Sequence, residues 1–377
     1  MTILQDTPTQ LVAWGDRPAW DDEADTILVC RRRHAVTHDV TTFVFEALAP
    51  RRFDYEPGQF ITIGVEIEGT LTERCYTISS SPTRPFTISI TVKRVPGGVV
   101  SNWLHDNLQP GQTINARGPL GQFTCADYPA DKYLFLSGGS GITPVMSMLR
   151  TLHDLSHDAD VVFVHSARTP VDIVFRRELA EIASASPSVQ VAHVCETDAP
   201  TEAWEGHRGR LTVETLTQIC PDFRDREVFV CGPGPYMAAV KSLLSNAGFD
   251  MDRHHQESFV LDELLSDSEA VDATDADAIV AGGGGDSETD TGFDVEFTKS
   301  NTTIHCSADT PVLDAATKAG LNMPSSCGQG LCGTCKVTLV SGEVDMQHNG
   351  GIRPKEIAQN KILLCCSKPK TPLVVDA

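Results

Sequence analysis

The chain has 377 residues, which exceeds one compact core and predicts two to four domains at roughly 100 to 200 residues each. Its composition is 41% apolar, and no apolar run approaches the roughly 20 residues of a bilayer-spanning helix, which argues against a membrane span. The formal net charge of −21 argues against nucleic-acid binding, which requires a basic surface.

The N-terminal extension, residues 1–25, lacks a basic stretch followed by an apolar core, so it does not resemble a secretory signal. We therefore expect a cytoplasmic protein. In a reducing compartment the twelve cysteines predict a metal site rather than a disulfide framework. For the extension itself, with Trp14 and Trp20, packing on the body and remaining mobile both stay open.

Residues 26–128 are predicted to form a small antiparallel barrel. In residues 61–67 the apolar Ile61, Ile63 and Val65 alternate with polar or small residues, and residues 88–92 repeat this pattern. Turns rich in proline and glycine separate the strands, as expected in a small all-β domain.

From residue 129 to 259 the pattern changes to short apolar strands that each precede a helical stretch. This alternation predicts a parallel sheet whose ligand-binding loops lie at the carboxyl ends of the strands. The strand and helix pairs are expected at 132–137 with 144–155, 160–166 with 172–183, and 227–232 with 236–248.

Residues 260–290 are predicted to be a flexible linker. They contain ten acids, no Lys or Arg, and the glycine run 282–285, and they offer little apolar surface to bury. Like charges extend such a segment and glycines loosen it, so it would tether the last domain, residues 291–377. That domain opens with two short strands and a helix.

The strongest motif is a group of cysteines in this last domain. Cys327, Cys332 and Cys335 follow the spacing C-x4-C-x2-C, and Cys365 follows with 29 residues intervening. This is the spacing of plant-type [2Fe-2S] sites, in which four thiolates hold two irons. Glycines between the cysteines let the backbone N–H groups approach the cluster.

A zinc site is the alternative, although zinc usually takes paired cysteine knuckles rather than a glycine-filled loop. Cys366 competes with Cys365 for the fourth position. The stretch 292–377 resembles the plant-type ferredoxin domain, and the resemblance favours Cys365 because Pro369 follows it by four residues.

In the barrel, the segment from Arg74 to Ser80 resembles the R-x-Y-[ST] flavin motif of the ferredoxin–NADP reductase superfamily. The resemblance implies that Arg74 pairs with the flavin phosphate, that Tyr76 packs along the flavin, and that Thr77 bonds the ring near N5. The motif alone is weak, because many β-strands carry such residues.

A second turn, which contains Gly98, Val99 and Ser101, resembles the flavin-phosphate turn of the same family. We expect its free N–H groups and the N-terminus of a helix over 103–108 to face the phosphate. A plain hairpin turn is the alternative for this piece.

A glycine-rich turn follows the first strand of the parallel sheet and contains Gly138, Gly139 and Gly141. Thr143 is expected to cap the next helix and Pro144 to lie in its first turn, which leaves N–H groups for a pyrophosphate. A glycine turn without a ligand is the alternative.

The segment that begins at Cys231 and Gly232 resembles the C-G-P nicotinamide motif of the reductase family. By that resemblance Cys231 lies beside the nicotinamide ring and Glu257 lies near the reactive edge of the flavin. A packed thiol and a surface carboxylate are the alternatives.

These motifs occur in one order, each on the element predicted for it. The chain resembles reductase components of Rieske-type oxygenases, particularly those for glycine betaine and related quaternary amines, and the NADH oxidoreductase of the hybrid cluster protein. The resemblance implies an antiparallel flavin-binding β-barrel, an α/β parallel-sheet nucleotide-binding domain and a β-grasp ferredoxin domain. It also implies that electrons pass from NADH through a flavin to the cluster and on to a protein acceptor; a non-catalytic redox-sensing module is the alternative.

Two cofactor choices stay open. The second phosphate turn favours FAD, although reductases similar to phthalate dioxygenase reductase have the same domain order and use FMN. NADH is expected from the resemblance, while Arg168, after a predicted strand, could contact a 2′-phosphate, lie on the adenine or face solvent. The last domain has eight acidic and eight basic residues, so no steering charge identifies the acceptor.

Overall fold

The computed structural model describes residues 17–22, 24–67, 69–258, 292–300, 302–321, 323, 328, 330 and 333–377. The predicted linker and the cysteines Cys327 and Cys332 lie outside these residues, as does most of the N-terminal extension. Within the described residues, none of the helices has the length and apolar character needed to cross a membrane.

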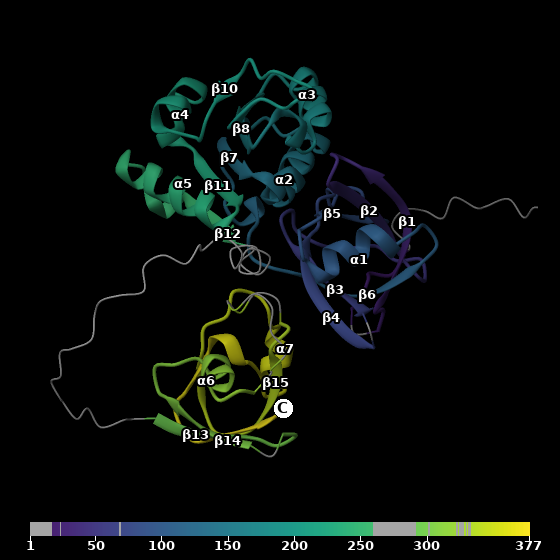
Figure 1. Ribbon diagram of the computed structural model, residues 1–377, viewed down its shortest axis with the longest axis vertical. Coiled ribbons are helices and arrows are strands. Elements are labelled where there is room, and N and C mark those ends of the chain that lie inside the picture. Colours follow the sequence, from purple (N-terminus) through teal and green to yellow (C-terminus); the bar gives the residue numbers. More distant parts are fainter. Residues whose placement is uncertain are drawn as a thin grey trace, which may run out of the picture.

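The first domain is an antiparallel barrel (Figure 1), with the strand order β4-β3-β6-β1-β2-β5. A bridge between Ile78 and Ile90 brings the two ends of this sheet together, which closes the barrel. Alternate side chains fill its interior, and α1 (Val99–Asn107) adds Val100 and Leu104 to the same apolar core. The strands are β1 (Ile27–Ala35), β2 (Val40–Ala47), β3 (Phe60–Ile67), β4 (Thr70–Thr77), β5 (Ile88–Lys93) and β6 (Thr113–Leu120).

The second domain is a parallel sheet in the order β10-β9-β8-β7-β11-β12. One face carries an apolar cluster with α2 and α3, and the other a cluster with α4 and α5. Its strands are β7 (Lys132–Gly138), β8 (Asp160–Ala167), β9 (Val189–Cys195), β10 (His207–Arg208), β11 (Glu227–Gly232) and β12 (His254–Ser258). Its helices are α2 (Ile142–Asp154), α3 (Arg176–Ala185), α4 (Val213–Ile219) and α5 (Gly234–Asn246).

The barrel and the parallel sheet share one apolar cluster. Val40 and Phe123 of the barrel side belong to the same buried group as Phe135 and Phe229 of the sheet. Because separating the domains would expose this group to water, the two domains are held together by burial of apolar surface.

The third domain has a five-stranded sheet in the order β14-β13-β19-β15-β17 and a small sheet of β16 and β18. Its apolar core consists of residues between 295 and 377. The strands are β13 (Gly292–Phe297), β14 (Thr302–Ser307), β15 (Lys336–Ser341), β16 (Val344–Met346), β17 (Lys361–Leu363), β18 (Ser367–Pro369) and β19 (Leu373–Asp376). The helices are α6 (Val312–Lys318) and α7 (Pro354–Ile357).

The predicted fold class is therefore confirmed: an antiparallel barrel, a parallel sheet flanked by helices, and a separate domain that carries the cysteines. The predicted helix starts were inaccurate: α3 begins at Arg176 rather than at residue 172, and α2 and α5 each begin two residues earlier than predicted. Helix α1 begins at Val99 rather than at residue 103, because the N-cap Gly98 keeps an extended backbone and the helical turns start directly after it.

Candidate functional site

The predicted flavin motif lies at the end of β4. Thr77 is 3% exposed, and its hydroxyl oxygen has no hydrogen-bond partner among the described residues. Tyr76 packs half-buried against the barrel core, and the Arg74 guanidinium donates to the Glu73 carbonyl of its own strand at 2.8 Å. A buried hydroxyl without a partner is unfavourable, so Thr77 fits a polar ligand such as the flavin ring.

The turn before α1 fits a phosphate. Gly98 is the N-cap without a side-chain cap, so the first N–H groups of α1 are not capped by it. The Ser101 hydroxyl accepts from the Val95 N–H at 3.3 Å and donates to the Gly98 carbonyl at 3.4 Å, and therefore shapes the turn. Val99 is 49% exposed at the first helical position.

The glycine turn after β7 passes through Gly139, whose φ of +52° favours glycine. Thr143 is not the N-cap of α2, as the sequence suggested. The N-cap is Gly141, while Thr143 lies in the first turn with Pro144 and donates from its hydroxyl to the Ser140 carbonyl at 3.3 Å. With no side-chain cap on the helix, its first N–H groups suit a pyrophosphate.

The glycine turn after β7 and the turn after β11, which are both predicted to bind the nucleotide and are called the nucleotide turns below, touch each other. A Cβ atom on Gly141 would lie 2.5 Å from the backbone of Cys231 and Gly232, and one on Gly138 would lie 3.0 Å from the Tyr236 ring. The approach at Gly141 therefore requires glycine, while the contact at Gly138 is tight. The turns that follow β7 and β11 therefore form one continuous floor at the carboxyl edge of the sheet.

Cys231 and Glu257 lie side by side, because β11 and β12 pair in parallel with these two residues in register. Cys231 is fully buried, and Glu257 is 4% exposed with one carboxylate oxygen unpartnered among the described residues. Burial raises the pKa of Glu257 to about 8 and that of Cys231 well above its usual range. The surface-carboxylate alternative for Glu257 is thus excluded by the burial.

Three further polar residues lie in one row with Cys231 across the sheet, and the sequence analysis missed them. Ser137, His165 and His193 are in register with Cys231 on the neighbouring strands, and the Ser137 hydroxyl lies 2.8 Å from Nδ1 of His165. Burial lowers the pKa of His165 to about 3 and that of His193 to about 4, so both imidazoles are neutral. Only pairing of the strands reveals this row, because the three residues are far apart in the sequence.

Arg168 is exposed just beyond the end of β8, and its carbonyl accepts from the Thr197 N–H at 2.9 Å. The structure does not bring it together with Cys231 and Glu257, which are buried under the nucleotide turns. This position agrees with the predicted alternatives of contact with the outer part of a nucleotide or with solvent.

Helix α2 connects the nucleotide turns to the end of β4, the strand that carries the predicted flavin motif. Its Ser147 hydroxyl donates to the Ser80 carbonyl at 2.7 Å, and its Arg150 guanidinium donates to the Ser79 carbonyl. Figure 1 shows α2 on the side of the sheet that faces the barrel. The segment after Thr77 is therefore fixed directly to the helix that begins at the glycine turn.

The described cysteines of the third domain fit an iron–sulfur cluster. Cys335 and Cys365 are 3% and 7% exposed, and the Cys365 N–H donates to the Cys335 sulfur at 3.5 Å. The Gly330 N–H donates to the Cys365 sulfur at 3.2 Å, from a backbone with φ of +69°. Backbone N–H groups aimed at buried sulfurs stabilise thiolate ligands. Of the four predicted ligands, Cys327 and Cys332 lie outside the described residues.

Cys366, the competitor of Cys365, is half-buried, and its thiol lies 3.7 Å from the Leu363 carbonyl. The backbone N–H bond from the glycine loop goes to Cys365 instead. This contact supports Cys365 as the fourth ligand.

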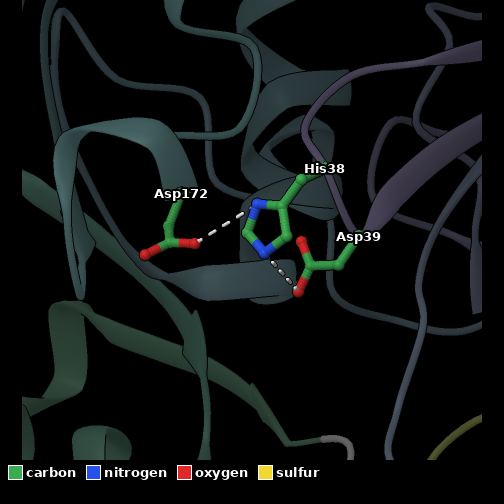
Figure 2. Close-up of side chains that lie close together, drawn as sticks. All are labelled: His38, Asp39 and Asp172. Atoms are coloured by element: carbon green, nitrogen blue, oxygen red, sulfur yellow. Dashed lines mark ion pairs between the residues drawn. The ribbon is translucent and has the colours of Figure 1, made fainter. Parts of the chain in front are cut away.

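A polar group of His38, Asp39 and Asp172 lies where the barrel meets the parallel-sheet domain (Figure 2). The imidazole nitrogens are 3.9 Å from Asp39 and 3.8 Å from Asp172, and the His38 side chain is 64% exposed. At such exposure and distance the group is a weak surface contact.

Comparisons with known proteins agree with this arrangement. The oxidoreductase FAD-binding domain matches residues 28–125, the oxidoreductase NAD-binding domain matches 135–242, and the 2Fe-2S iron–sulfur cluster binding domain matches 295–370. The solved structure of phthalate dioxygenase reductase is 24% identical with a TM-score of 0.55, and the match covers 94% of this chain and 99% of that one.

Two relatives are similar over most of their length. The glycine betaine monooxygenase reductase subunit of Pseudomonas aeruginosa is 49% identical over 342 residues, which covers 90% of this chain and 92% of the relative. The stachydrine N-demethylase reductase subunit of Rhizobium meliloti is 39% identical over 358 residues, covering 95% and 98%. The chain therefore belongs to the family of FAD- and [2Fe-2S]-dependent NAD(P)H oxidoreductases that includes the glycine betaine monooxygenase reductase subunits.

Proposed function

We propose that the chain is the NADH-dependent reductase component of a Rieske-type monooxygenase that acts on glycine betaine or a related quaternary amine. The substrate class comes from the two relatives whose names specify glycine betaine and stachydrine. The electron-transfer role is supported by one structural observation: Glu257 is buried beside Cys231 at the edge where the nucleotide turns meet. The same chain also carries the buried Cys365 that is predicted to hold the cluster.

The residues suit the transfer of a hydride followed by the removal of single electrons. FAD, when bound, accepts the two electrons of NADH together and gives them up one at a time, as a one-electron acceptor such as [2Fe-2S] requires. The chain's own residues handle the proton: one NADH yields NAD⁺, two electrons and one proton. The Glu257 carboxyl, which burial keeps protonated below a pKa of about 8, can release its own proton and then take up the one from NADH.

The other residues position the reactants in this proposal. Thr77 would hold the flavin ring, while Arg74, Gly98 and Ser101 would hold its phosphates. The turns with Gly138, Gly139, Gly141, Thr143, Cys231 and Gly232 would hold the nicotinamide nucleotide. Cys327, Cys332, Cys335 and Cys365 would hold the cluster, of which the last two are described.

NADH rather than NADPH is part of the proposal and rests on the resemblance alone, because the exposed position of Arg168 suits either nucleotide. Cytoplasmic location is also proposed, supported by the cysteines that the structure describes, none of which forms a disulfide. The partner would be the oxygenase component itself.

The proposal is tested by anaerobic titration of the holoprotein with NADH, followed by visible and low-temperature EPR spectra. Bleaching of the flavin absorbance together with a rhombic S = 1/2 signal is expected. Reconstitution with a Rieske-type oxygenase should then give NADH oxidation that depends on glycine betaine. An oxidised cluster beside a reduced flavin would overturn the internal relay, and coupling only to the hybrid cluster protein would overturn the assigned partner.

A further inference from the structure

The described part of the N-terminal extension is attached to the barrel. The Trp20 indole N–H donates to the Gly118 carbonyl at 3.0 Å, and its ring lies 5.4 Å from the Phe53 ring. Its backbone N–H donates to the Arg52 carbonyl at 2.7 Å. Trp20 thus has a fixed position on the barrel, and the other described residues 17–22 adjoin it in the chain.

Asp22, two residues after this anchor, uses its two carboxylate oxygens for two different domains. One oxygen accepts from the Gly118 N–H of the barrel at 2.6 Å, and the other lies 2.6 Å from the Arg353 guanidinium of the third domain. The side chains are 10% and 27% exposed, so the ion pair is partly shielded from water. This pair joins the extension directly to the third domain.

Arg353 follows residues 349–351, which hold Gly330 in the loop of the predicted cluster cysteines (called the cluster loop below). The Asn349 and Gly351 N–H groups both donate to the Gly330 carbonyl, at 3.1 and 2.9 Å, and Gly330 is the residue whose N–H reaches Cys365. Arg353 of the ion pair is therefore only two residues from Gly351, whose N–H holds the cluster loop.

The same segment reaches the flavin end of the barrel. A Cβ atom on Gly350 would lie 3.1 Å from the Gln122 side chain and 3.5 Å from Gly121. These two residues come directly after Leu120, which is paired with Phe60, which is paired in turn with Thr77. Two strand spacings, about 10 Å, thus separate this contact from the flavin strand.

The third domain is docked without a shared apolar core. Among the described residues, its buried cluster contains only its own side chains, in contrast to the cluster that joins the first two domains. Where it faces β4 and β6, a pocket of about 860 Å³ remains, lined by charged residues that include Arg74 and Arg117 of the barrel and Lys299 and Lys361 of the third domain. Docking therefore depends on polar contacts, which can form and break repeatedly.

We propose that Asp22 and Arg353 are positioning residues that dock the cluster loop against the flavin end of the barrel for internal electron transfer. In the docked state the flavin would give one electron to the oxidised cluster, which would pass it to the external acceptor before taking the second, so the two electrons of one NADH reduce two one-electron acceptors. Opening of the Asp22–Arg353 contact frees the domain to meet the external acceptor. This inference rests on the proposed function, because it assigns a role within the NADH-to-cluster relay.

The test compares the holoprotein with Asp22→Asn, Arg353→Gln and the double variant. Asp22→Asn keeps an oxygen that can accept from the Gly118 N–H, so it removes the ion pair and leaves the anchor. The matched control is Asp25→Asn, which breaks the Asp25–Arg51 pair of the same segment, also 2.6 Å long and 17% and 26% exposed but confined to the barrel side. Stopped-flow absorbance separates flavin reduction by NADH from the later reduction of the cluster.

We expect flavin reduction to be unchanged in every variant. Cluster reduction should slow about five- to tenfold in Asp22→Asn and in Arg353→Gln, and no further in the double variant, since either change removes the same contact. Salt at about 1 M should slow the wild type toward the variants, because it screens the pair. In X-ray scattering, the radius of gyration should rise in Asp22→Asn and stay unchanged in Asp25→Asn.

Equal cluster-reduction rates and equal radii for Asp22→Asn and Asp25→Asn would overturn the docking role, and so would additive effects of the two single variants. Failure of NADH to reduce the flavin or the cluster in the wild type would instead overturn the proposed function. The scattering measurement still tests docking in that case, because it needs no electron transfer.

Discussion

The buried carboxyl of Glu257 should make the stability of the protein fall with rising pH, and Glu257→Gln should remove this effect. The carboxyl has a pKa of about 8 in the folded protein against an ordinary value of 4.5, because burial disfavours the charged form. Between these pH values the unfolded chain has lost the proton that the folded protein still binds. Stability is therefore highest below pH 4.5 as far as this group is concerned, and is lost as the pH rises to about 8.

The magnitude follows from the separation of the two pKa values. At 1.36 kcal/mol per pH unit, the interval from 4.5 to about 8 corresponds to about 5 kcal/mol. A Gln side chain has nearly the same size but does not ionise. The free energy of unfolding of Glu257→Gln relative to wild type should thus rise by about 1.4 kcal/mol per pH unit across this interval and level off above it.

Urea unfolding of both proteins between pH 5 and pH 9 measures this difference, because other titrating groups cancel in the comparison. The infrared carbonyl band of a protonated carboxyl, present in wild type and absent in the variant, gives the pKa directly. A stability difference that is the same at pH 5.5 and pH 8.5 would show that Glu257 is already ionised in the folded protein, and the burial argument would then be wrong.

Three further outcomes are expected. Cys365→Ser should abolish the visible and EPR signals of the cluster, whereas Cys366→Ser should retain them, and the reverse result would assign the fourth ligand to Cys366. Gly141→Ala should push the turn away from Cys231 and lower the free energy of unfolding by about 1–3 kcal/mol, with weaker NADH binding seen by calorimetry; unchanged binding would contradict the packing of the two turns. Arg150→Gln should lower the free energy of unfolding in urea by about 2 kcal/mol, because it removes bonds to Glu178 and to the Ser79 carbonyl, and a change below about 0.5 kcal/mol would show that these bonds add little to the junction.

The elements of the fold could be predicted because each carries a local signal. Alternation along β3 and the strand-to-helix rhythm of the second domain depend on residues close in the sequence, and the structure follows them. The helix starts were less accurate. Thr143 has the side chain of a cap, yet Gly141 occupies that position because the turn must approach Cys231 closely, which is a contact from a distant strand.

Parts of the candidate site depend on strand pairing and could not be predicted. The sequence identified Cys231 and Glu257 as separate candidates, but only the register of β11 and β12 places them side by side. Likewise, His165 carries no local motif, and its place in the polar row follows from pairing with Ser137. The role of Asp22 could not be predicted from the sequence either, since its partner Arg353 is more than 300 residues away.

The apolar cluster shared by the barrel and the parallel sheet limits how this protein can be rearranged by recombination. Val40 and Phe123 complete the packing around Phe135 and Phe229, so a gene fragment that ends between these domains would encode two incomplete cores. The third domain completes its own core and carries its own cysteines, so it can be exchanged for another electron carrier, or joined to the opposite end of the chain, without opening the apolar cores of the other two. Recombination should therefore exchange two units: the barrel together with the parallel-sheet domain, and the third domain by itself.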